Sequence, residues 1–283
     1  MRFVALDVET ANPRMRSICQ IGAVVFENGQ EIASDVVLVD PCEEFDDINV
    51  SIHGIDETHV LGAKTFPELV PWLAEFTHGQ VVVCHTHFDR VAMAQAHDHH
   101  SLTSPPCRWL DTAMVARRAW PQFAQSGYGI QNLANSFGIR FQHHDALEDA
   151  RTAGLVLLRA IDQSGFDLDH WLARVKLSLS GQPKGRHRRD GDGDGPLVGE
   201  TVVFTGSLSI PRREAADLAH IAGGAVEPGV TKNTSILVVG DQDLERMAGK
   251  VKSSKHLKGE MLAAKGQPIR FLAESDFLAL LAE

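Results

Sequence analysis

Residues 178–196 (SLSGQPKGRHRRDGDGDGP) are the feature that most limits how this chain can fold. Gly, Pro, Ser and alternating charges leave the segment no periodic apolar face with which to join a core. We therefore predict a flexible linker at 178–195 between two domains, residues 1–177 and 196–283. The run GDGDG inside it lacks the twelve-residue spacing and terminal Glu of an EF-hand calcium loop.

The composition is that of a globular protein, with 43% hydrophobic and 23% charged residues. No apolar run reaches the length of a membrane span, and MRFVALDVET enters a strand pattern at once, which predicts neither a membrane segment nor a signal peptide. The four cysteines form no C-x-x-C pair, so a reduced cytoplasmic protein is expected rather than a disulfide framework or zinc ribbon.

The net charge of −10 argues against a protein that coats nucleic acid through bulk electrostatics. Almost all of the excess acidity lies in residues 1–177. A cluster of carboxylates there could form a metal site or simply a solvated surface.

Alternating and helical apolar patterns predict the elements of both domains. Three strands come first, and the Asn-Gly of ENGQ predicts a hairpin between the second and third. These strands, followed by mixed helices and strands, indicate an α/β or α+β domain with a mixed sheet, and the second domain is a small α/β unit. The expected strands are 3–10, 19–26, 33–40, 80–85, 200–206 and 235–240; the expected helices are 65–77, 126–139, 146–161, 212–222, a basic helix around 250–258, and 275–283.

Acidic residues recur where these elements begin or end. Asp7 and Glu9 share one face of the first strand, and Asp89 follows the apolar strand VVVC. In HHDALEDA we expect His144 on the approach to a helix, with Asp149 projecting from it. Each acid alone could merely meet solvent, but an oxygen-rich set with little sulfur suits Mg²⁺ or Mn²⁺ better than zinc.

DVET, HTHFDR and HHDALEDA, in that order, resemble the DEDDh 3'→5' exonucleases, a group that includes the proofreading epsilon subunit of bacterial replicative polymerases and RNase T. The resemblance covers roughly residues 1–165 and includes SICQIG, IHGI and WLDTAMVARR. It implies a ribonuclease-H-like fold.

The resemblance also implies roles for particular residues. Four carboxylates would hold two divalent ions, Mg²⁺ or Mn²⁺, and His144 would be the general base. Another group would contact the terminal nucleotide, with Phe88 stacking or wedging against a base. The implied metal ligands are Asp7, Glu9, Asp89 and Asp149; the implied nucleotide contacts are Thr10, Ile52, His53 and Phe88.

The chain departs from the family pattern beside the expected nucleotide site. Ala11 and Asn12 stand where many relatives have Thr-Gly, and residues 85–87 read His-Thr-His where many have His-Asn-Ala. Both departures bear on substrate preference. The histidines of residues 85–87 and 97–100 could bind zinc, but a strand-end hydrogen-bonding role is favoured for the first group and a polar helix end for the second, because the fourth ligand of a zinc site is missing. His143 is expected to neighbour the helix cap.

LVGETVVFTGSL, RREA, the Gly-Gly turn, SILVVG and SDFLALL resemble a BRCT domain, nearest to the bacterial DNA ligase type, over about 196–283. Such domains bind phosphates on DNA ends or phosphoproteins. The residues expected to form this site are Thr205, Gly206, Arg213 and Lys255. A solvated Lys-rich helix face, or a plain protein-docking domain, are the alternatives.

Together these features predict a metal-dependent 3'→5' exonuclease that trims DNA in repair or replication, with the BRCT domain directing it to DNA or to a protein partner. An exoribonuclease is the alternative within the enzyme class, since no residue identifies a reader of the 2'-OH. A non-catalytic scaffold that binds DNA ends is the alternative from another class.

Overall fold

The computed structural model describes residues 1–124, 126–177, 195–240 and 253–282. The predicted linker therefore lies outside the described residues, apart from residue 195, and the domain boundaries at 177 and 196 stay predictions. The contacts divide the chain into two compact units. Of the described residues, the first unit holds Met1–Ala11, Arg16–Phe45 and 55–177, and the second holds Asn12–Met15, Asp46–Gly54, 195–240 and 253–282.

The first unit is built on a mixed sheet in the order β4-β3-β2-β1-β5-β6. The first three strands are antiparallel, and β5 and β6 run parallel to β1. Asn28 and Gly29 both have positive φ angles, 52° and 82°, as the predicted hairpin between β2 and β3 requires. The strands are β1 (Arg2–Thr10), β2 (Ile18–Glu27), β3 (Gln30–Asp40), β4 (Lys64–Thr65), β5 (Val81–Cys84) and β6 (Arg108–Asp111).

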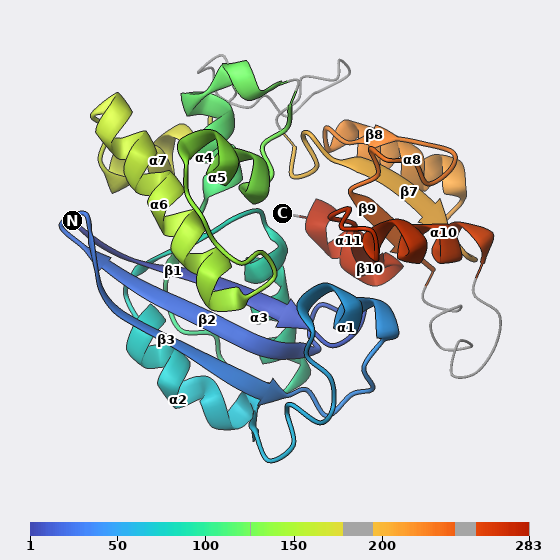
Figure 1. Cartoon of the computed structure of the whole chain (residues 1–283), viewed down its shortest axis with the longest axis horizontal. Helices are drawn as coiled ribbons and strands as arrows, with labels where there is room; N and C mark the ends of the chain where they lie inside the picture. The colour runs from blue at the N-terminus through green and yellow to red at the C-terminus, as the bar shows by residue number, and fades with distance from the viewer. Residues whose placement is uncertain (125, 178–194, 241–252, 283) are drawn as a thin grey trace. The chain divides into compact units, whose positions relative to one another are not determined.

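Helices cover both faces of this sheet, and Figure 1 shows α6 lying across β1 and β2. Phe3 and Ala5 of β1 join the large core under α6, whereas Val4 packs with Trp72 and Phe76 of α2 on the opposite face. The helical segments of the first unit are α2 (Phe66–Thr77), α3 (Phe88–His99), α4 (Thr112–Ala119), the 3₁₀ turn η1 (Pro121–Ala124), α5 (Ile130–Phe137), α6 (Ala146–Ser164) and α7 (Leu168–Arg174).

Two glycines allow α6 to approach the sheet closely. A Cβ on Gly22 of β2 would lie 2.3 Å from the backbone carbonyl atoms of Ala146, the first residue of α6. More than two turns further along, a Cβ on Gly154 of α6 would lie 2.2 Å from the ring of Phe26. The close packing of interiors leaves no room for either atom, so both positions require glycine.

The second unit contains a parallel sheet in the order β10-β9-β7-β8, as expected of a small α/β domain. The predicted strands 200–206 and 235–240 are present, while the short strands β8 and β10 were not predicted. Helix α1 and residues 12–15 belong to this unit. Its elements are α1 (Asp47–His53), β7 (Thr201–Thr205), α8 (Arg212–Ile221), β8 (Ala225–Val226), β9 (Ile236–Val239), α10 (Ser254–Ala263), β10 (Arg270–Ala273) and α11 (Glu274–Leu281).

Within the part of the chain that the structure describes, no helix combines the length and apolar character needed to cross a membrane.

Gly22→Ala is expected to destabilise the first unit by about 3 kcal/mol, because the added methyl group must displace the backbone of α6. Urea unfolding followed by tryptophan fluorescence measures this change in the first unit alone, since Trp72, Trp109, Trp120 and Trp171 all lie there. Gly129→Ala is the control, because a Cβ at Gly129 meets no atom within 4 Å. Equal free energies of unfolding for the two variants would contradict the steric argument.

Candidate active site

Strand β1 carries the first two acids of the site. Asp7 and Glu9 continue the face of Phe3 and Ala5, because alternate residues of a strand share a face, and that face is the one covered by α6. Glu9 is largely buried, with 12% of its side chain exposed. The apolar pattern of β1 thus directs both carboxylates into the layer between sheet and helix.

Asp89 reaches the same place from the first turn of α3, directly after β5. Because β5 pairs in parallel with β1, the carboxyl ends of the two strands lie side by side. The backbone N–H of Val8 donates a hydrogen bond of 3.2 Å to Asp89 Oδ1, and only 2% of Asp89 is exposed. This bond ties the start of α3 to the end of β1.

Helix α6 supplies the fourth acid. Asp145 is its N-cap, accepting from the backbone N–H groups of Leu147 and Glu148, and Asp149 projects from the first turn, as predicted. The backbone N–H of His144 donates to Asp149 Oδ2 at 2.7 Å. His144 has the left-handed φ angle of 67°, an uncommon one for a residue other than glycine.

These elements gather the predicted residues into one cluster. One carboxylate oxygen from each of Asp7, Glu9 and Asp149 lies within 4.8 Å of the other two. The charge of Asp89 acts on all three. The Nδ1 atom of His144 lies 4.0 Å from Glu9 Oε1.

Burial and mutual repulsion make the charged cluster unfavourable by itself. Desolvation, followed by the neighbouring carboxylates, raises the pKa of Asp7 and of Glu9 well above the usual range. Burial raises the pKa of Asp149 to about 8, although the N–H of His144 opposes the shift. A bound cation would reverse these shifts by favouring the ionised carboxylates.

The donor set fits a divalent cation that prefers oxygen ligands. Asp149 Oδ1 is buried and accepts no hydrogen bond from any described residue; His143 Nε2 lies 3.9 Å from it. An inward-facing carboxylate oxygen of this kind is a ready metal ligand. Both groups of residues able to hold an ion within the described part of the chain include Asp149.

The predicted nucleotide contacts fall into two groups. Thr10, at the end of β1, is buried, and Phe88 opens α3 directly before Asp89, so both adjoin the carboxylates along the chain. Ile52 and His53 end α1, which belongs to the second unit, and Ile52 packs against the hydrophobic cluster there. Contact with a nucleotide remains a prediction for all four.

Three of the histidines considered above as zinc ligands instead contact protein oxygen atoms. His85 contacts Thr112 Oγ1 at 2.8 Å and the carbonyl of Tyr128 at 2.9 Å. His87 Nδ1 lies 2.9 Å from Asp111 Oδ2. On α3, His97 Nδ1 contacts the carbonyl of Met93 at 2.7 Å. Sequence reasoning missed Asp111, which accepts from His87 and also caps α4.

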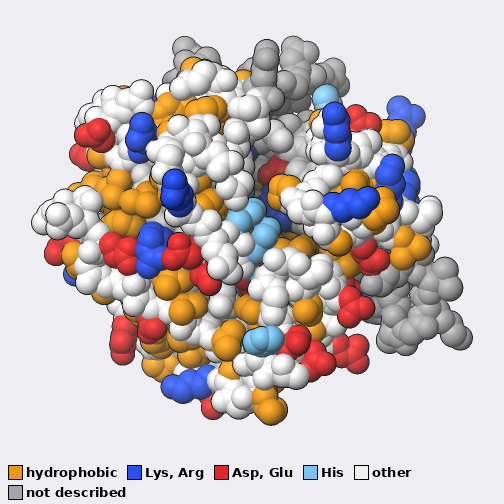
Figure 2. Space-filling view, in the orientation of Figure 1, with side chains coloured by type: hydrophobic (Ala, Val, Ile, Leu, Met, Phe, Trp, Pro, Cys, Tyr) orange, Lys and Arg blue, Asp and Glu red, His pale blue; other side chains and the backbone are white. Residues whose placement is uncertain are grey.

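In the second unit, positive charge gathers at the end of β7. Lys255 Nζ donates to the carbonyl of Phe204 at 3.2 Å, and the guanidinium of Arg212 donates to the carbonyls of Phe204 and Gly206. Burial and the charge of Arg212 lower the pKa of Lys255. Neither cation forms an ion pair with a carboxylate among the residues that the structure describes. Figure 2 shows Lys and Arg side chains gathered over α8 and α10.

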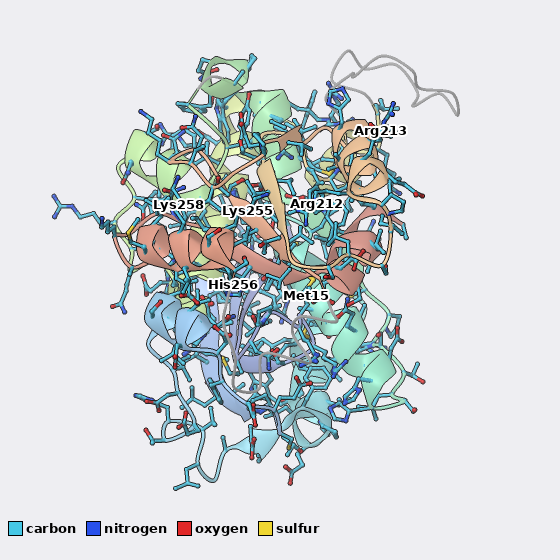
Figure 3. The ribbon with its side chains drawn as sticks, turned by 90° about the vertical axis from the view of Figure 1, so that its right-hand side faces the viewer. Met15, Arg212, Arg213, Lys255, His256 and Lys258 are labelled. Atoms are coloured by element: carbon cyan, nitrogen blue, oxygen red, sulfur yellow. The ribbon has the colours of Figure 1, made fainter. Side chains whose placement is uncertain are left out.

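The predicted phosphate residues only partly coincide with this cluster. Thr205 is buried, with Oγ1 2.5 Å from Ser253 Oγ, and Gly206 follows it. Arg213, however, lies farther from Lys255 than Arg212 does, as Figure 3 shows. The sequence offers two adjacent arginines, and only the phase of α8 decides which one faces the end of β7. The basic residues Lys250 and Lys252 lie outside the described residues.

Comparison with known families agrees with this architecture. The RNase_T profile, described as "Exonuclease", matches residues 4–157, and the BRCA1 C Terminus (BRCT) domain profile matches residues 193–266. The chain therefore belongs to the RNase_T exonuclease family, and it carries a BRCT domain. This confirms the family resemblance drawn from the sequence.

Curated relatives share the exonuclease part of the chain. DNA polymerase III PolC-type of Streptococcus thermophilus is 29% identical over 159 residues, which are 55% of this chain and 11% of that protein. The 3'-5' exonuclease DinG of Bacillus subtilis is 29% identical over 167 residues, 57% of this chain and 18% of that protein. The chain thus spans less than a fifth of the length of either relative.

Among solved structures, zinc-bound E. coli exonuclease I with single-stranded DNA matches with a TM-score of 0.51 and 13% identity, over 62% of this chain and 43% of that chain. This likeness concerns the fold alone. Together with the family match, it confirms the predicted mixed-sheet, ribonuclease-H-like architecture.

Asp149→Asn is expected to stabilise the metal-free protein at pH 8 by a few kcal/mol on an order-of-magnitude basis. Because the pKa of Asp149 is raised to about 8, the folded state holds a proton that the unfolded state has released. Wild-type stability therefore falls as pH rises from the ordinary carboxyl range toward 8, and the advantage of the variant shrinks toward pH 4. Urea unfolding in EDTA, followed by tryptophan fluorescence, measures this difference.

The exposed Asp162→Asn on the same helix is the control and should match wild type. Adding MnCl2 should raise the Tm of wild type and of the control, but have little effect on Asp149→Asn. An identical Mn²⁺ response in all three proteins would contradict a metal site at Asp149.

Proposed function

We propose that this chain is a metal-dependent 3'→5' exonuclease that hydrolyses phosphodiester bonds from the 3' end of DNA. The observation that carries the proposal is the convergence of Asp7, Glu9, Asp89 and Asp149, with His144 beside them. Buried carboxylates in such proximity are unfavourable without a cation, so a merely structural role explains them poorly. The membership in an exonuclease family supports the same conclusion.

Each group then has a defined task. The four carboxylates hold Mg²⁺ or Mn²⁺, two ions in our proposal, which when bound activate a water and stabilise the leaving 3'-oxygen. His144 takes the proton of the attacking water. This role suits its partly buried imidazole, since 30% of the side chain is exposed. Thr10 and Phe88, which adjoin the carboxylates along the chain, hold the terminal nucleotide in this proposal, with Phe88 against a base, while Ile52 and His53 stay predicted contacts.

DNA is the favoured substrate. The PolC-type relative is by name a DNA polymerase, and the DinG relative is by name a 3'-5' exonuclease. The BRCT domain associates the nuclease with DNA metabolism. An exoribonuclease is the alternative, and direct comparison of the two substrates separates them. The cysteines of the chain, all free, suit the reducing cytoplasm, where we propose that it acts.

We further propose that the BRCT domain binds a phosphate group at the end of β7, on DNA in preference to a protein. Arg212 and Lys255 project charged donors beside Thr205, and backbone carbonyls hold them there without neutralising their charge. Because neither cation pairs with a carboxylate among the described residues, the two together favour an anionic ligand. Arg212 takes the place that the sequence assigned to Arg213.

Wild-type protein with Mg²⁺ or Mn²⁺ is expected to shorten 5'-labelled single-stranded DNA in single-nucleotide steps from the 3' end. EDTA should abolish the ladder, Asp7→Ala should remove it, and His144→Ala should slow it by at least roughly 100-fold, because the water then loses its base. Denaturing gels of DNA and RNA of one sequence, side by side, provide the measurement. Asp162→Ala, exposed on α6, is the control and should retain activity.

Equal or faster degradation of the RNA would favour the exoribonuclease. Absence of a ladder on both substrates, in a protein with a normal circular dichroism spectrum, would favour the scaffold. Full activity of both Asp7→Ala and His144→Ala would overturn the assignment of the site.

Arg212→Ala and Lys255→Ala should each weaken binding of 5'-phosphorylated duplex DNA by about tenfold, the magnitude of one lost charge-assisted hydrogen bond. Lys258→Ala, an exposed lysine on α10, is the control and should bind as before. Fluorescence anisotropy is measured with the full chain in EDTA, which abolishes cleavage, and in a His144→Ala background, which slows any residual cleavage. Binding of a phosphoserine peptide, but equally weak binding of phosphorylated and unphosphorylated DNA, would move the ligand to a phosphoprotein.

A further inference from the structure

His143 is a second histidine at the site, and the family pattern assigns it no role. Its ring lies over the ring of His144 with centroids 3.8 Å apart and an interplanar angle of 30°. Ring centroids of aromatic pairs are usually 4.5–7 Å apart, so this contact is close, with the two rings tilted against each other. The two imidazoles therefore form a stack directly beside the carboxylates.

Neighbouring residues do not normally stack in this way. In a strand their side chains point to opposite faces, and in a helix adjacent positions do not face one another. The left-handed φ of 67° at His144 turns the chain so that both rings lie on one side. The hydrogen bond of 2.7 Å from the His144 N–H to Asp149 Oδ2 holds that conformation.

The outer ring of the stack is itself restrained. Phe141 contacts His143 edge to face, with centroids 5.6 Å apart and an angle of 63°. His143 Nε2 lies 3.9 Å from Asp149 Oδ1, and 25% of the side chain is exposed. Phe141, His143 and His144 thus lie in series, so that the inner imidazole rests against a ring that is already packed.

We propose that His143 is a positioning residue for His144, acting through the face of its ring. The stack covers one face of the His144 imidazole and limits its rotamers to those that keep Nδ1 near Glu9 Oε1, 4.0 Å away. A histidine in a loop otherwise has several rotamers of similar energy, and small misplacements of a reacting group slow reactions strongly. The stacking of the two rings does not depend on the proposed nuclease function. Only the expected effect on catalysis rests on it.

The kinetic test compares His143→Ala, which removes the ring, with His143→Phe, which keeps a flat ring but no nitrogen. His143→Ala should lower kcat about tenfold, from the strength of an aromatic pair, and leave KM within about twofold. His143→Phe should restore kcat to within about threefold of wild type. His78→Ala, at the exposed end of α2, is the control histidine.

Unchanged kcat in His143→Ala would overturn the proposal. Equal losses in His143→Ala and His143→Phe would also overturn it, because the imidazole nitrogen and not the ring face would then be required. Thermal unfolding followed by tryptophan fluorescence identifies any variant whose fold is impaired, and His143→Phe then carries the comparison with wild type.

A second measurement is independent of catalysis. The imidazole proton signals of His144, assigned by their loss in His144→Gln, should show a ring-current shift in metal-free protein that disappears in His143→Ala and persists in His143→Phe. An identical His144 spectrum in wild type and His143→Ala would overturn the stack. A wild-type protein without nuclease activity that still shows the shift would refute the proposed function and leave the stack in place.

Discussion

The close approach of α6 to β2 at Gly22 is the contact on which the rest of the site depends. Gly22 is the cross-strand partner of Asp7, and the backbone of Ala146 occupies the space that a side chain would fill. The N-terminus of α6 therefore lies directly over the acids of β1. Only this proximity brings Asp149 and the His144 loop to carboxylates that are more than 130 positions earlier in the chain. The oxygen of Gln20 strengthens it by accepting the N–H of Ala146 at 3.0 Å.

The same proximity makes the site electrostatically unfavourable. Four carboxylates share a desolvated layer, and the pKa of Asp149 is raised to about 8 as a result. Backbone N–H groups of Val8 and His144 offset part of the cost. The large apolar core between the sheet and α4–α7 supplies the remaining stability. The fold therefore tolerates the unfavourable free energy of a carboxylate cluster that is arranged to bind a cation. In the BRCT domain the charge is reversed, and backbone carbonyls hold the cations.

Long periodic elements were predictable from the sequence, because burial of one face imposes its period on the residues. The strands around Asp7 and Val82, the hairpin at Asn28 and the helix from Ala146 are all present where expected. The two-residue strands β4 and β8, and the four-residue strands β6 and β10, were not predicted. Their pairing comes from neighbouring strands, and a segment of two residues has no period of its own to detect.

The spacing of motifs in the sequence by itself determined the chemistry of this protein: which carboxylates and which histidine belong together, and which family the chain resembles. Choices between adjacent residues were decided by the tertiary structure. Arg212 rather than Arg213 faces the end of β7, since the phase of α8 on its sheet selects one of them. His143 stacks on His144 because a left-handed backbone, held by Asp149, turns two neighbouring side chains to one side. Neither orientation can be read from the periodic pattern of the sequence, since each depends on a hydrogen bond, to a residue five to eight positions away, that forms only when the chain is folded.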